Sequence, residues 1–584
     1  MKINTRTSAA IAAAAVMIAA LGSCGGNTSS QTTTSGAETT AAAAEQTAAQ
    51  DTTSAAQETS SAAATEETAP AADSADKKIT VVESWTFDSG FYPVLSPETS
   101  MNYGSAYWTR NFYQTLVTYD DNGDIVGELA EDWAVSDDGL TYTFDLRDGV
   151  KFCDGSDLTS ADVKATFEAT IENLGMYNGS YGKLSAIIAD MQTPDDDTFV
   201  MTLSQPYYGV FNDLTMCLPL GIVQSEAFEG SAANAYTFCA DKTAGTGAYM
   251  LDSVSDNVYS FVLNPYFWGE KPEVEAFDIK VIDDNDAKIL ALRSGEIDAI
   301  LGTSRISYDG FADLAASGEF GTAIGEAAQQ TRFLSFNLMK APFDNAAVRQ
   351  AVAYAVNQQL ISDAIFSGIE TPAETLFDKS RPYCNVNVTE YETNTEKAAQ
   401  LLDEAGITDT DGDGIRELDG APLELTFIYT QSFATLDDAV LAIASELQEI
   451  GLGVNIVGGD MMTWFGYMMS GDYDLNLYYT YGGTFDPYTL VTNINPNSSS
   501  DPVAMQWASF LDNGEIIIAL DSETDQAKIQ ELYNTILSTL ADECITVPVT
   551  CTHDLAVFNS DKIAAYHGSA SDPQYVLIYG IDLK

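Results

Sequence analysis

Basic residues are scarce in this chain of 584 residues. It has 25 Lys and Arg against 86 Asp and Glu, which gives a formal charge of −61. A nucleic-acid-binding protein needs a basic surface, and so does a protein held to anionic lipid by electrostatics, so both classes are excluded. The chain is not disordered as a whole either, because 45% of its residues are hydrophobic and 10% are aromatic.

Histidine and cysteine are also scarce. The two histidines, His553 and His567, lie in the last segment, and we interpret both as ordinary surface or packing residues. Neutral imidazole is the commonest metal ligand in proteins, so direct ligation of a metal by this chain is disfavoured and no cofactor is expected. The seven cysteines are widely spaced with no C-x-x-C pair, which indicates buried free thiols rather than a disulfide framework or a zinc site.

Long hydrophobic runs are missing after the N-terminus, so we expect no membrane-spanning segment in the body. Residues 9–21 are apolar but too short to span a bilayer, and Lys2 and Arg6 precede them, as in a signal peptide. The following LGSC sequence resembles the lipobox of bacterial lipoproteins. That resemblance implies cleavage after residue 23, a lipid on Cys24 and an extracytoplasmic protein anchored to the cell membrane. The alternative is an ordinary secretory signal with a chance cysteine.

Residues 24–78 form a tether of low complexity that is rich in Thr, Ser, Ala, Gln and Glu and has no aromatic residue. Such a composition buries too little apolar surface to fold. The tether has eight acids and two lysines and the signal peptide has two basic residues, so residues 79–584 carry a charge of −57. The acidity therefore belongs to the folded part, and only the lipid is expected to hold the protein at the membrane.

The folded part has about 506 residues, more than one hydrophobic core usually organises, so we expect two lobes. Residues 140–146 alternate apolar and polar side chains, which predicts a half-buried strand. Helical spacing of apolar residues predicts helices after the capping residues Thr159, Asn345 and Thr395, and further helices over residues 440–450 and 529–540. Strands are predicted over 454–457 and 545–549, so the class is α/β with layered lobes.

Several sequence blocks, in order, resemble the peptide/nickel class of solute-binding proteins of ABC importers. The blocks are GELAEDW (127–133), AGTGAY (244–249), NPYFWGEKP (264–272), SGEID (294–298), and FN with APF and VRQA between residues 336 and 351. The resemblance covers nearly all of residues 79–584. Each block alone is a weak signal, whereas the ordered set is specific.

The resemblance implies an α/β clamp of the periplasmic-binding-protein type (type II, family 5), with two lobes and an extra subdomain in the larger one. Residues 79–331 would form lobe I, 332–544 lobe II, and 545–584 the return of the chain to lobe I. The two crossings are expected near 332–338 and 544–549. A monomer would capture ligand in the cleft and deliver it to a permease of two transmembrane subunits driven by ATPases.

The ligand is expected to be an oligopeptide or a nickel or other metal chelate. The closest resemblance is to the nickel-chelate binders, but the position of their pocket histidine is Tyr478 here, and arginine is absent near Tyr177 and at Gly221. In the peptide branch an Asp typically holds the peptide ammonium, and that position is Gly483, although Asp486 could supply another carboxylate. The two ligand classes therefore both stay open.

Aromatic residues cluster where the family places its cleft, and rings can supply rigid contact area and face a cationic ligand. Core packing is the alternative for each one. The candidate ligand-binding residues are Trp85, Phe87, Tyr107, Trp108, Tyr177, Trp464, Phe465, Tyr478, Tyr481 and Asp486.

Residues 409–414 (DTDGDG) resemble the first half of a calcium loop, with carboxylates from Asp409, Asp411 and Asp413. The twelfth position is Gly420, where a bidentate Glu is expected, although Glu417 could contribute from the ninth. We interpret the segment as a solvated acidic turn, with a calcium site at Asp409, Asp411 and Asp413 as the alternative.

The sequence thus predicts a binding protein and not an enzyme. The alternatives are a secreted peptide hydrolase and a clamp-fold sensor that feeds no importer. The hydrolase is disfavoured because the sequence has neither G-x-S-x-G nor H-E-x-x-H.

Overall fold

The computed structural model describes residues 77–94, 104–120, 123–175, 182–302, 305–431, 434–481, 487–497, 499, 501–569 and 575–584. The signal peptide, Cys24 and the tether up to residue 76 lie outside these residues, as do Tyr177 and Asp486. None of the helices in the described part is long and apolar enough to cross a membrane.

One large mixed sheet runs through the molecule, in the order β17-β16-β18-β12-β19-β11-β1-β10-β9-β8, with β13 paired to β19. Its strands are β1 (Lys78–Glu83), β8 (Tyr249–Ser255), β9 (Val258–Leu263), β10 (Ala276–Val281), β11 (Ala299–Leu301), β12 (Gly321–Phe336), β13 (Thr371–Pro372), β16 (Glu424–Thr430), β17 (Gly453–Gly459), β18 (Leu475–Tyr479) and β19 (Thr546–Phe558).

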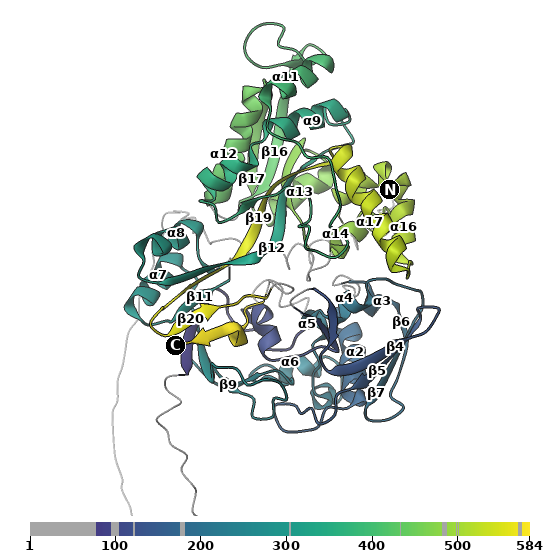
Figure 1. Ribbon diagram of the computed structural model, residues 1–584, viewed down its shortest axis with the longest axis vertical. Helices are drawn as coiled ribbons and strands as arrows, with labels where there is room; N and C mark the ends of the chain where they lie inside the picture. Colours follow the sequence, from purple (N-terminus) through teal and green to yellow (C-terminus); the bar gives the residue numbers. More distant parts are fainter. Residues whose placement is uncertain are drawn as a thin grey trace, which may run out of the picture.

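The two long strands β12 and β19 join an upper and a lower part of the molecule (Figure 1). The lower part, which we call the first lobe, carries β1 and β8 to β11. The upper part, the second lobe, carries β16 to β18. Between the lobes the pairing of β12 with β19 is irregular, with register shifts from Ile324 to Ala328 and from Ala328 to Thr331.

A subdomain of the first lobe is built on a separate antiparallel sheet in the order β4-β5-β7-β6. Its strands are β4 (Ala130–Val135), β5 (Thr141–Leu146), β6 (Ile188–Gln192) and β7 (Thr198–Leu203), and its helices are α2 (Ser160–Leu174), α3 (Leu184–Ile187) and α4 (Val210–Leu214). The apolar faces of β5 and β7 meet α2 in a core that contains Phe144, Phe167 and Phe199. The extra subdomain that the family resemblance implied is therefore present.

Short elements complete the first lobe. They are η1 (Gly104–Asn111), β2 (Val117–Tyr119), β3 (Ile125–Gly127), α5 (Cys217–Leu220), η3 (Ser225–Phe228), α6 (Asn234–Phe238), α7 (Asn285–Ser294), α8 (Tyr308–Ser317), β20 (Ile563–Tyr566), η8 (Ile578–Gly580) and β21 (Ile581–Leu583). The C-terminal β20–β21 pair packs into the same core as β1.

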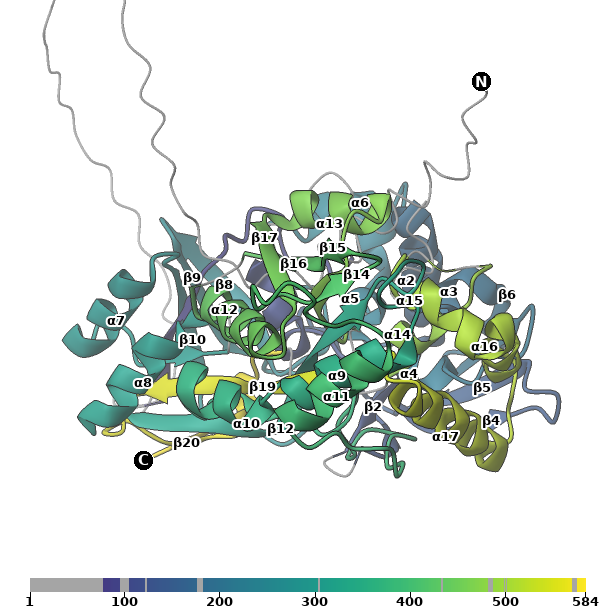
Figure 2. The ribbon, with the colours of Figure 1, turned by 90° about the horizontal axis from the view of Figure 1, so that it is seen from above.

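Helices surround the strands of the second lobe (Figures 1 and 2). They are α9 (Ala346–Ala355), α10 (Gln358–Leu360), η5 (Ile361–Ile365), α11 (Thr395–Glu404), α12 (Ala434–Glu449), α13 (Met461–Ser470), α14 (Tyr488–Thr492), α15 (Ala504–Trp507), η6 (Ala508–Phe510), η7 (Asp512–Gly514), α16 (Glu515–Asp521) and α17 (Gln526–Asp542), with a small β14 (Glu417–Leu418) and β15 (Ala421–Pro422) hairpin.

Most of the predicted elements are confirmed, and the caps explain where several helices begin. The Thr159 amide donates to Asp162 Oδ2 at 2.9 Å at the start of α2, and Asn345 caps α9 as expected. The predicted cap of α11 was wrong by one residue, because Asn394 and not Thr395 accepts the amide of Lys397. An Asn side chain can make the same capping bond as Thr, so the residue pattern alone does not separate the two positions.

The cysteines of the described residues, Cys153 and five others, are all free, and the five others are buried. This confirms the prediction of free thiols for that part of the chain. Burial raises the pKa of the Cys239 and Cys544 thiols to about 12, so these groups are protonated and unreactive at neutral pH.

Candidate functional site

The carboxyl ends of the parallel strands in both lobes point toward the irregular middle of β12 and β19. In the first lobe β1 runs parallel to β10 and β11, and Leu301 at the end of β11 pairs with Ala556 of β19. In the second lobe β16 is parallel to β17 and β18, and Tyr479 at the end of β18 pairs with Arg332 of β12. Ligands of open α/β sheets bind outside the carboxyl ends of such strands, so the two edges define one site between the lobes.

The edge of the first lobe is organised by Glu83, the last residue of β1, whose side chain is fully buried. Its Oε1 accepts the amides of Ser84 and Trp85 at 2.6 and 3.3 Å. Its Oε2 accepts Trp108 Nε1 at 2.8 Å and Arg305 Nη2 at 2.7 Å. Glu83 thus holds the start of the segment after β1 and a guanidinium that follows β11.

Trp85, Tyr107 and Arg305 form a stack at this edge. The rings of Trp85 and Tyr107 lie 5.4 Å apart and are nearly parallel, and the Arg305 guanidinium lies 4.2 Å from the Tyr107 centroid. Trp85 and Tyr107 are half-buried, whereas Arg305 is buried. Since Glu83 balances the charge of Arg305, the stack offers aromatic surface with little net charge. We call these three residues the aromatic stack.

A second buried cation lies behind the stack. Lys288 Nζ donates to Ser84 Oγ at 2.7 Å and to the Arg305 carbonyl at 3.0 Å. Burial lowers the pKa of Lys288 to about 8. The lysine ties α7 to the segments after β1 and β11, so its position indicates a structural role at the edge.

Phe87 and Trp108 belong to the core of the first lobe. Phe87 packs on Tyr259 with ring centroids 4.6 Å apart, and Trp108 stacks on Phe277 at 6.2 Å. Both side chains are buried. Their ligand-binding role stays a prediction, and the contacts that the structure gives them are core contacts.

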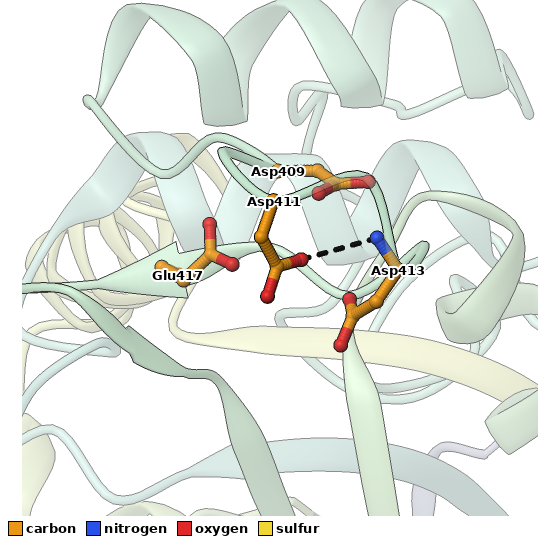
Figure 3. Close-up of side chains that lie close together, drawn as sticks. All are labelled: Asp409, Asp411, Asp413 and Glu417. Atoms are coloured by element: carbon orange, nitrogen blue, oxygen red, sulfur yellow. Dashed lines mark hydrogen bonds between the residues drawn. The ribbon is translucent and has the colours of Figure 1, made fainter.

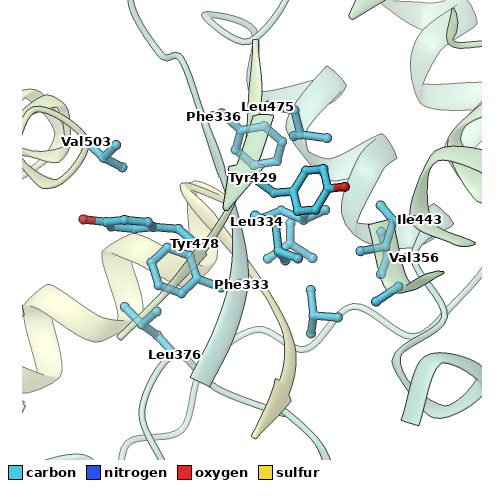
Figure 4. Packing of buried hydrophobic residues seen from close by; sticks show 14 of the residues in the cluster. Phe333, Leu334, Phe336, Val356, Leu376, Tyr429, Ile443, Leu475, Tyr478 and Val503 are labelled. Carbon is cyan, nitrogen blue, oxygen red and sulfur yellow. The ribbon is translucent and has the colours of Figure 1, made fainter. Parts of the chain in front are cut away.

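Two of the predicted residues of the second lobe, Tyr478 and Tyr481, meet at a buried carboxylate. The hydroxyls of Tyr478 and Tyr481 donate to Asp501 Oδ2 at 3.1 and 2.6 Å. Asp501 Oδ1 accepts the Val503 amide at 2.8 Å, and burial raises the pKa of the Asp501 carboxyl. Figure 4 shows Tyr478 packed on Phe333, with its hydroxyl directed toward Val503 and into the core of the lobe.

Trp464 and Phe465 of α13 are buried in the same core. Trp464 Nε1 donates to Asn476 Oδ1 at 2.9 Å, and its ring is stacked at 6.3 Å on Tyr479, which is half-buried. Tyr479 follows Tyr478 on β18, so its side chain projects from the opposite face of the strand. Sequence reasoning did not select Tyr479, and the alternation of the strand was the signal that could have done so.

A buried network lies where the two long strands leave the first lobe. Glu370 Oε1 accepts the Tyr308 hydroxyl at 2.7 Å and Arg332 Nε at 3.0 Å, and its Oε2 accepts Thr550 Oγ1 at 2.5 Å. These bonds join β12 and β19 to helix α8. Sequence reasoning missed Glu370, because nothing local distinguishes it from the many exposed acids of the chain.

Both histidines have partners, and His553 lies in the irregular stretch, where it pairs with Ala328 of β12. His553 of β19 has Nδ1 2.9 Å from the Gly325 carbonyl and Nε2 2.8 Å from Thr371 Oγ1. His567 is exposed, and its Nε2 lies 3.1 Å from Asp582. Neither histidine belongs to the cluster of carboxylates formed by Asp409, Asp411, Asp413 and Glu417.

The acidic turn at residues 409–417 brings four carboxylates together, with ligand-type oxygens within 4.8 Å of one another (Figure 3). Asp409, Asp411 and Asp413 are exposed, and Glu417 of β14 is buried. The turn binds its own backbone: Asp409 accepts the amides of Gly412 and Gly414 at 2.6 and 3.0 Å, and Glu417 accepts Thr410 at 2.7 Å. In this turn the carboxylates therefore accept hydrogen bonds from the amides of the turn itself. The interpretation of the segment as a solvated turn stays a prediction.

Comparison with known proteins gives a consistent result. Residues 124–501 match the family model described as bacterial extracellular solute-binding proteins, family 5 middle. The chain is 30% identical over 448 residues to the nickel-binding periplasmic protein of Escherichia coli K12, a match that covers 75% of this chain and 83% of that protein.

Solved structures have the same fold. The NikA protein of Brucella suis, crystallised with Fe(III)-EDTA, superposes with a TM-score of 0.77 at 27% identity and covers 87% of this chain and all of its own. The DppA protein of Helicobacter pylori, in complex with the peptide STSA, superposes with a TM-score of 0.65 at 22% identity, over 87% of this chain and 98% of its own, which shows likeness of fold.

Proposed function

Because this chain belongs to family 5 of the bacterial extracellular solute-binding proteins, we propose that it captures a small ligand between its lobes and delivers it to an ABC importer. The observation that carries this function is the convergence of the strand ends. The carboxyl ends of β1 and β11 and those of β16 and β18 face the same irregular stretch of β12 and β19. Hinge closure of two such lobes around a ligand is a common mode of binding.

The hinge lies in the irregular stretch of β12 and β19, where the strand register shifts. The register shifts between Ile324 and Thr331 support bending at this stretch. We keep the lobe boundaries of 79–331, 332–544 and 545–584 as part of this proposal. The Glu370 network would limit the bend, since it joins both strands to α8.

The ligand is an oligopeptide or a metal held in its own organic chelator. A bare metal ion is disfavoured because the ring nitrogens of His553 are engaged by Gly325 and Thr371, and because Tyr478, at the position of the nickel relatives' histidine, donates to Asp501. The aromatic stack of Trp85, Tyr107 and Arg305 is the recognition surface of the first lobe. It can pack on a chelator or on peptide side chains.

The protein works outside the cytoplasm as a monomer. Its importer would consist of two transmembrane subunits and their ATPases. A lipid on Cys24 would hold it at the membrane, and the tether of residues 24–78 would let the clamp reach the permease. A body with a charge of −57 would be repelled by anionic lipid, so its attachment to the membrane would depend on the lipid at Cys24.

Thermal denaturation with a ligand panel tests the ligand assignment. The panel contains di- and tripeptides, longer peptides, NiCl₂ alone, nickel with L-histidine, and Fe(III)-EDTA. A true ligand at 100 times its Kd stabilises the folded state by about 2.7 kcal/mol, which gives a clear rise in Tm. We expect a rise with a chelate or a peptide and none with NiCl₂ alone. A rise with NiCl₂ alone, or with no member of the panel, would overturn the assignment.

A further inference from the structure

Two contacts connect the subdomain of the first lobe directly to the second lobe, beside the strands that link the lobes. Helices α3 and α4 lie next to α16 and α17 in both views (Figures 1 and 2). The residues that meet there are more than 300 positions apart in the sequence, as in the pairs Lys183–Asp521 and Tyr208–Tyr533. The lobes are therefore closed against each other at this place.

The first contact is an ion pair. Lys183 Nζ lies 3.2 Å from Asp521 Oδ2, at the end of α16, with side chains that are 27% and 15% exposed. Partial burial protects this pair from solvent screening better than a surface pair.

Lys183 is held in place from behind. Asp213 Oδ2 accepts the amides of Lys183 and Leu184, each at 2.8 Å, and the Tyr207 hydroxyl at 2.9 Å. Gly182 leaves room for this carboxylate, because a Cβ there would lie 2.4 Å from Asp213 Cγ. The subdomain thus presents Lys183 in a fixed position toward the second lobe.

The second contact is aromatic. The hydroxyls of Tyr208 and Tyr533 are hydrogen-bonded at 2.8 Å, and Tyr383 stacks on Tyr533 with centroids 5.0 Å apart. Tyr488 of α14 belongs to the second lobe and reaches into the subdomain of the first lobe. It packs at 5.2 Å from Tyr207 and 5.0 Å from Tyr208, and it is part of the hydrophobic core of the subdomain.

We propose that Lys183–Asp521 and Tyr208–Tyr533, with Tyr488, form a latch that holds the two lobes closed in the absence of ligand. This inference rests on the proposed function, since a latch matters only for a clamp that opens. Opening at the hinge would separate both pairs and would expose Tyr488. A latch that raises the closed fraction of the free protein raises its apparent affinity in proportion to that fraction.

The test measures the radius of gyration of the ligand-free protein by small-angle X-ray scattering. The variants are Lys183→Met, Tyr208→Phe and the double variant. Each single change shifts the closed-to-open ratio about fivefold, in line with one lost hydrogen bond or partly buried ion pair, and the double variant shifts it about 25-fold if the two contacts are independent. We expect the wild type to be compact and the double variant to be expanded.

Matched controls remove similar groups within one lobe. Lys280 pairs with Glu296 at 3.2 Å and is 26% exposed, so Lys280→Met matches the loss at Lys183. The Tyr249 hydroxyl donates to the Val274 carbonyl at 2.8 Å, so Tyr249→Phe matches the loss at Tyr208. Both controls should stay as compact as the wild type.

Charge exchange gives an independent readout. The swapped variant K183D/D521K should be compact, whereas K183D alone should be expanded. The latch is refuted if the double variant K183M/Y208F is as compact as the wild type, or if the ligand-free wild type is already as expanded as that variant. No ligand enters these measurements, so the result stands apart from the outcome of the ligand panel.

Discussion

Arg305 Nη2 lies 2.7 Å from Glu83 Oε2, and both side chains are buried, at 3% and 0% exposure. The pair joins the ends of β1 and β11, two strands that are separated by more than 200 residues in the sequence. The same carboxylate also accepts the amide of Trp85 and the indole of Trp108. One buried acid therefore sets the geometry of the edge at which we place the ligand.

Glu83→Gln should destabilise the protein strongly. The amide has nearly the same shape but leaves the Arg305 guanidinium buried without its counter-charge, and breaking one side of a buried pair costs about 3–5 kcal/mol. Urea denaturation measures the loss.

The matched control is Glu168→Gln, which breaks the exposed pair of Glu168 with Lys164 on α2. Its effect should be within about 0.5 kcal/mol. Equal, small losses for both variants would contradict the assigned role of Glu83.

Asp213→Asn should remove a pH dependence of stability. Burial raises the pKa of Asp213 to about 7, against hydrogen bonds from Leu184, Tyr207 and Lys183 that act in the opposite direction. The unfolded value is about 3.9, so between about pH 4 and pH 7 the folded state binds more protons at this group than the unfolded state. The stabilisation that Asp213 gives to the folded state is thus fully present below about pH 4 and is lost as the pH rises through 7.

The measurement is the difference in unfolding free energy between wild type and Asp213→Asn at pH values from 4 to 8. Each pKa unit corresponds to about 1.4 kcal/mol. Across this range the wild type should therefore lose up to about 4 kcal/mol of unfolding free energy relative to Asp213→Asn. Glu446, whose pKa burial also raises to about 7, is present in both proteins and cancels. A difference that does not change with pH would show that Asp213 titrates normally.

The layered α/β architecture could be predicted from the sequence because the evidence for it lies in local patterns. The capping pairs and apolar spacing lie within single helices, as at Thr159 and Asp162 of α2. The site was harder to predict, since β18 is buried on both faces. Tyr478 and Tyr479 are neighbours of the same type, yet Tyr478 enters the core and only Tyr479 is half-exposed. Composition does not distinguish a core ring from a cleft ring.

No local pattern in the sequence predicts which residues meet between the two lobes. Tyr208 and Tyr533 meet through the packing of a subdomain against a helix 325 residues away. Such a pair depends on the closure of the whole chain and not on any local pattern. Glu370 is a similar case, because its burial comes only from the crossing of β12, β19 and α8.

Tyr478→Phe should leave ligand affinity unchanged and cost about 1 kcal/mol of stability. The hydroxyl donates to Asp501 inside the core, and Asp501 keeps its bonds to Tyr481 and to the Val503 amide. Urea denaturation and titration with a ligand found in the panel measure the two effects. A large loss of affinity with unchanged stability would place the Tyr478 hydroxyl in the ligand site after all.

Trp85→Ala should weaken ligand binding about 30-fold, because a large aromatic anchor at an interface typically contributes about 2 kcal/mol. The ring is half-buried and stacks on Tyr107 at the edge where the strand ends converge. Trp133→Ala is the control, since Trp133 is also half-buried and packs on Phe211 at 5.4 Å, but in the sheet of the subdomain. Calorimetric titration should show normal affinity for the control. Equal affinities for the two variants would move the ligand away from the aromatic stack, whereas a loss confined to Trp85→Ala would make this stack the recognition surface of the first lobe.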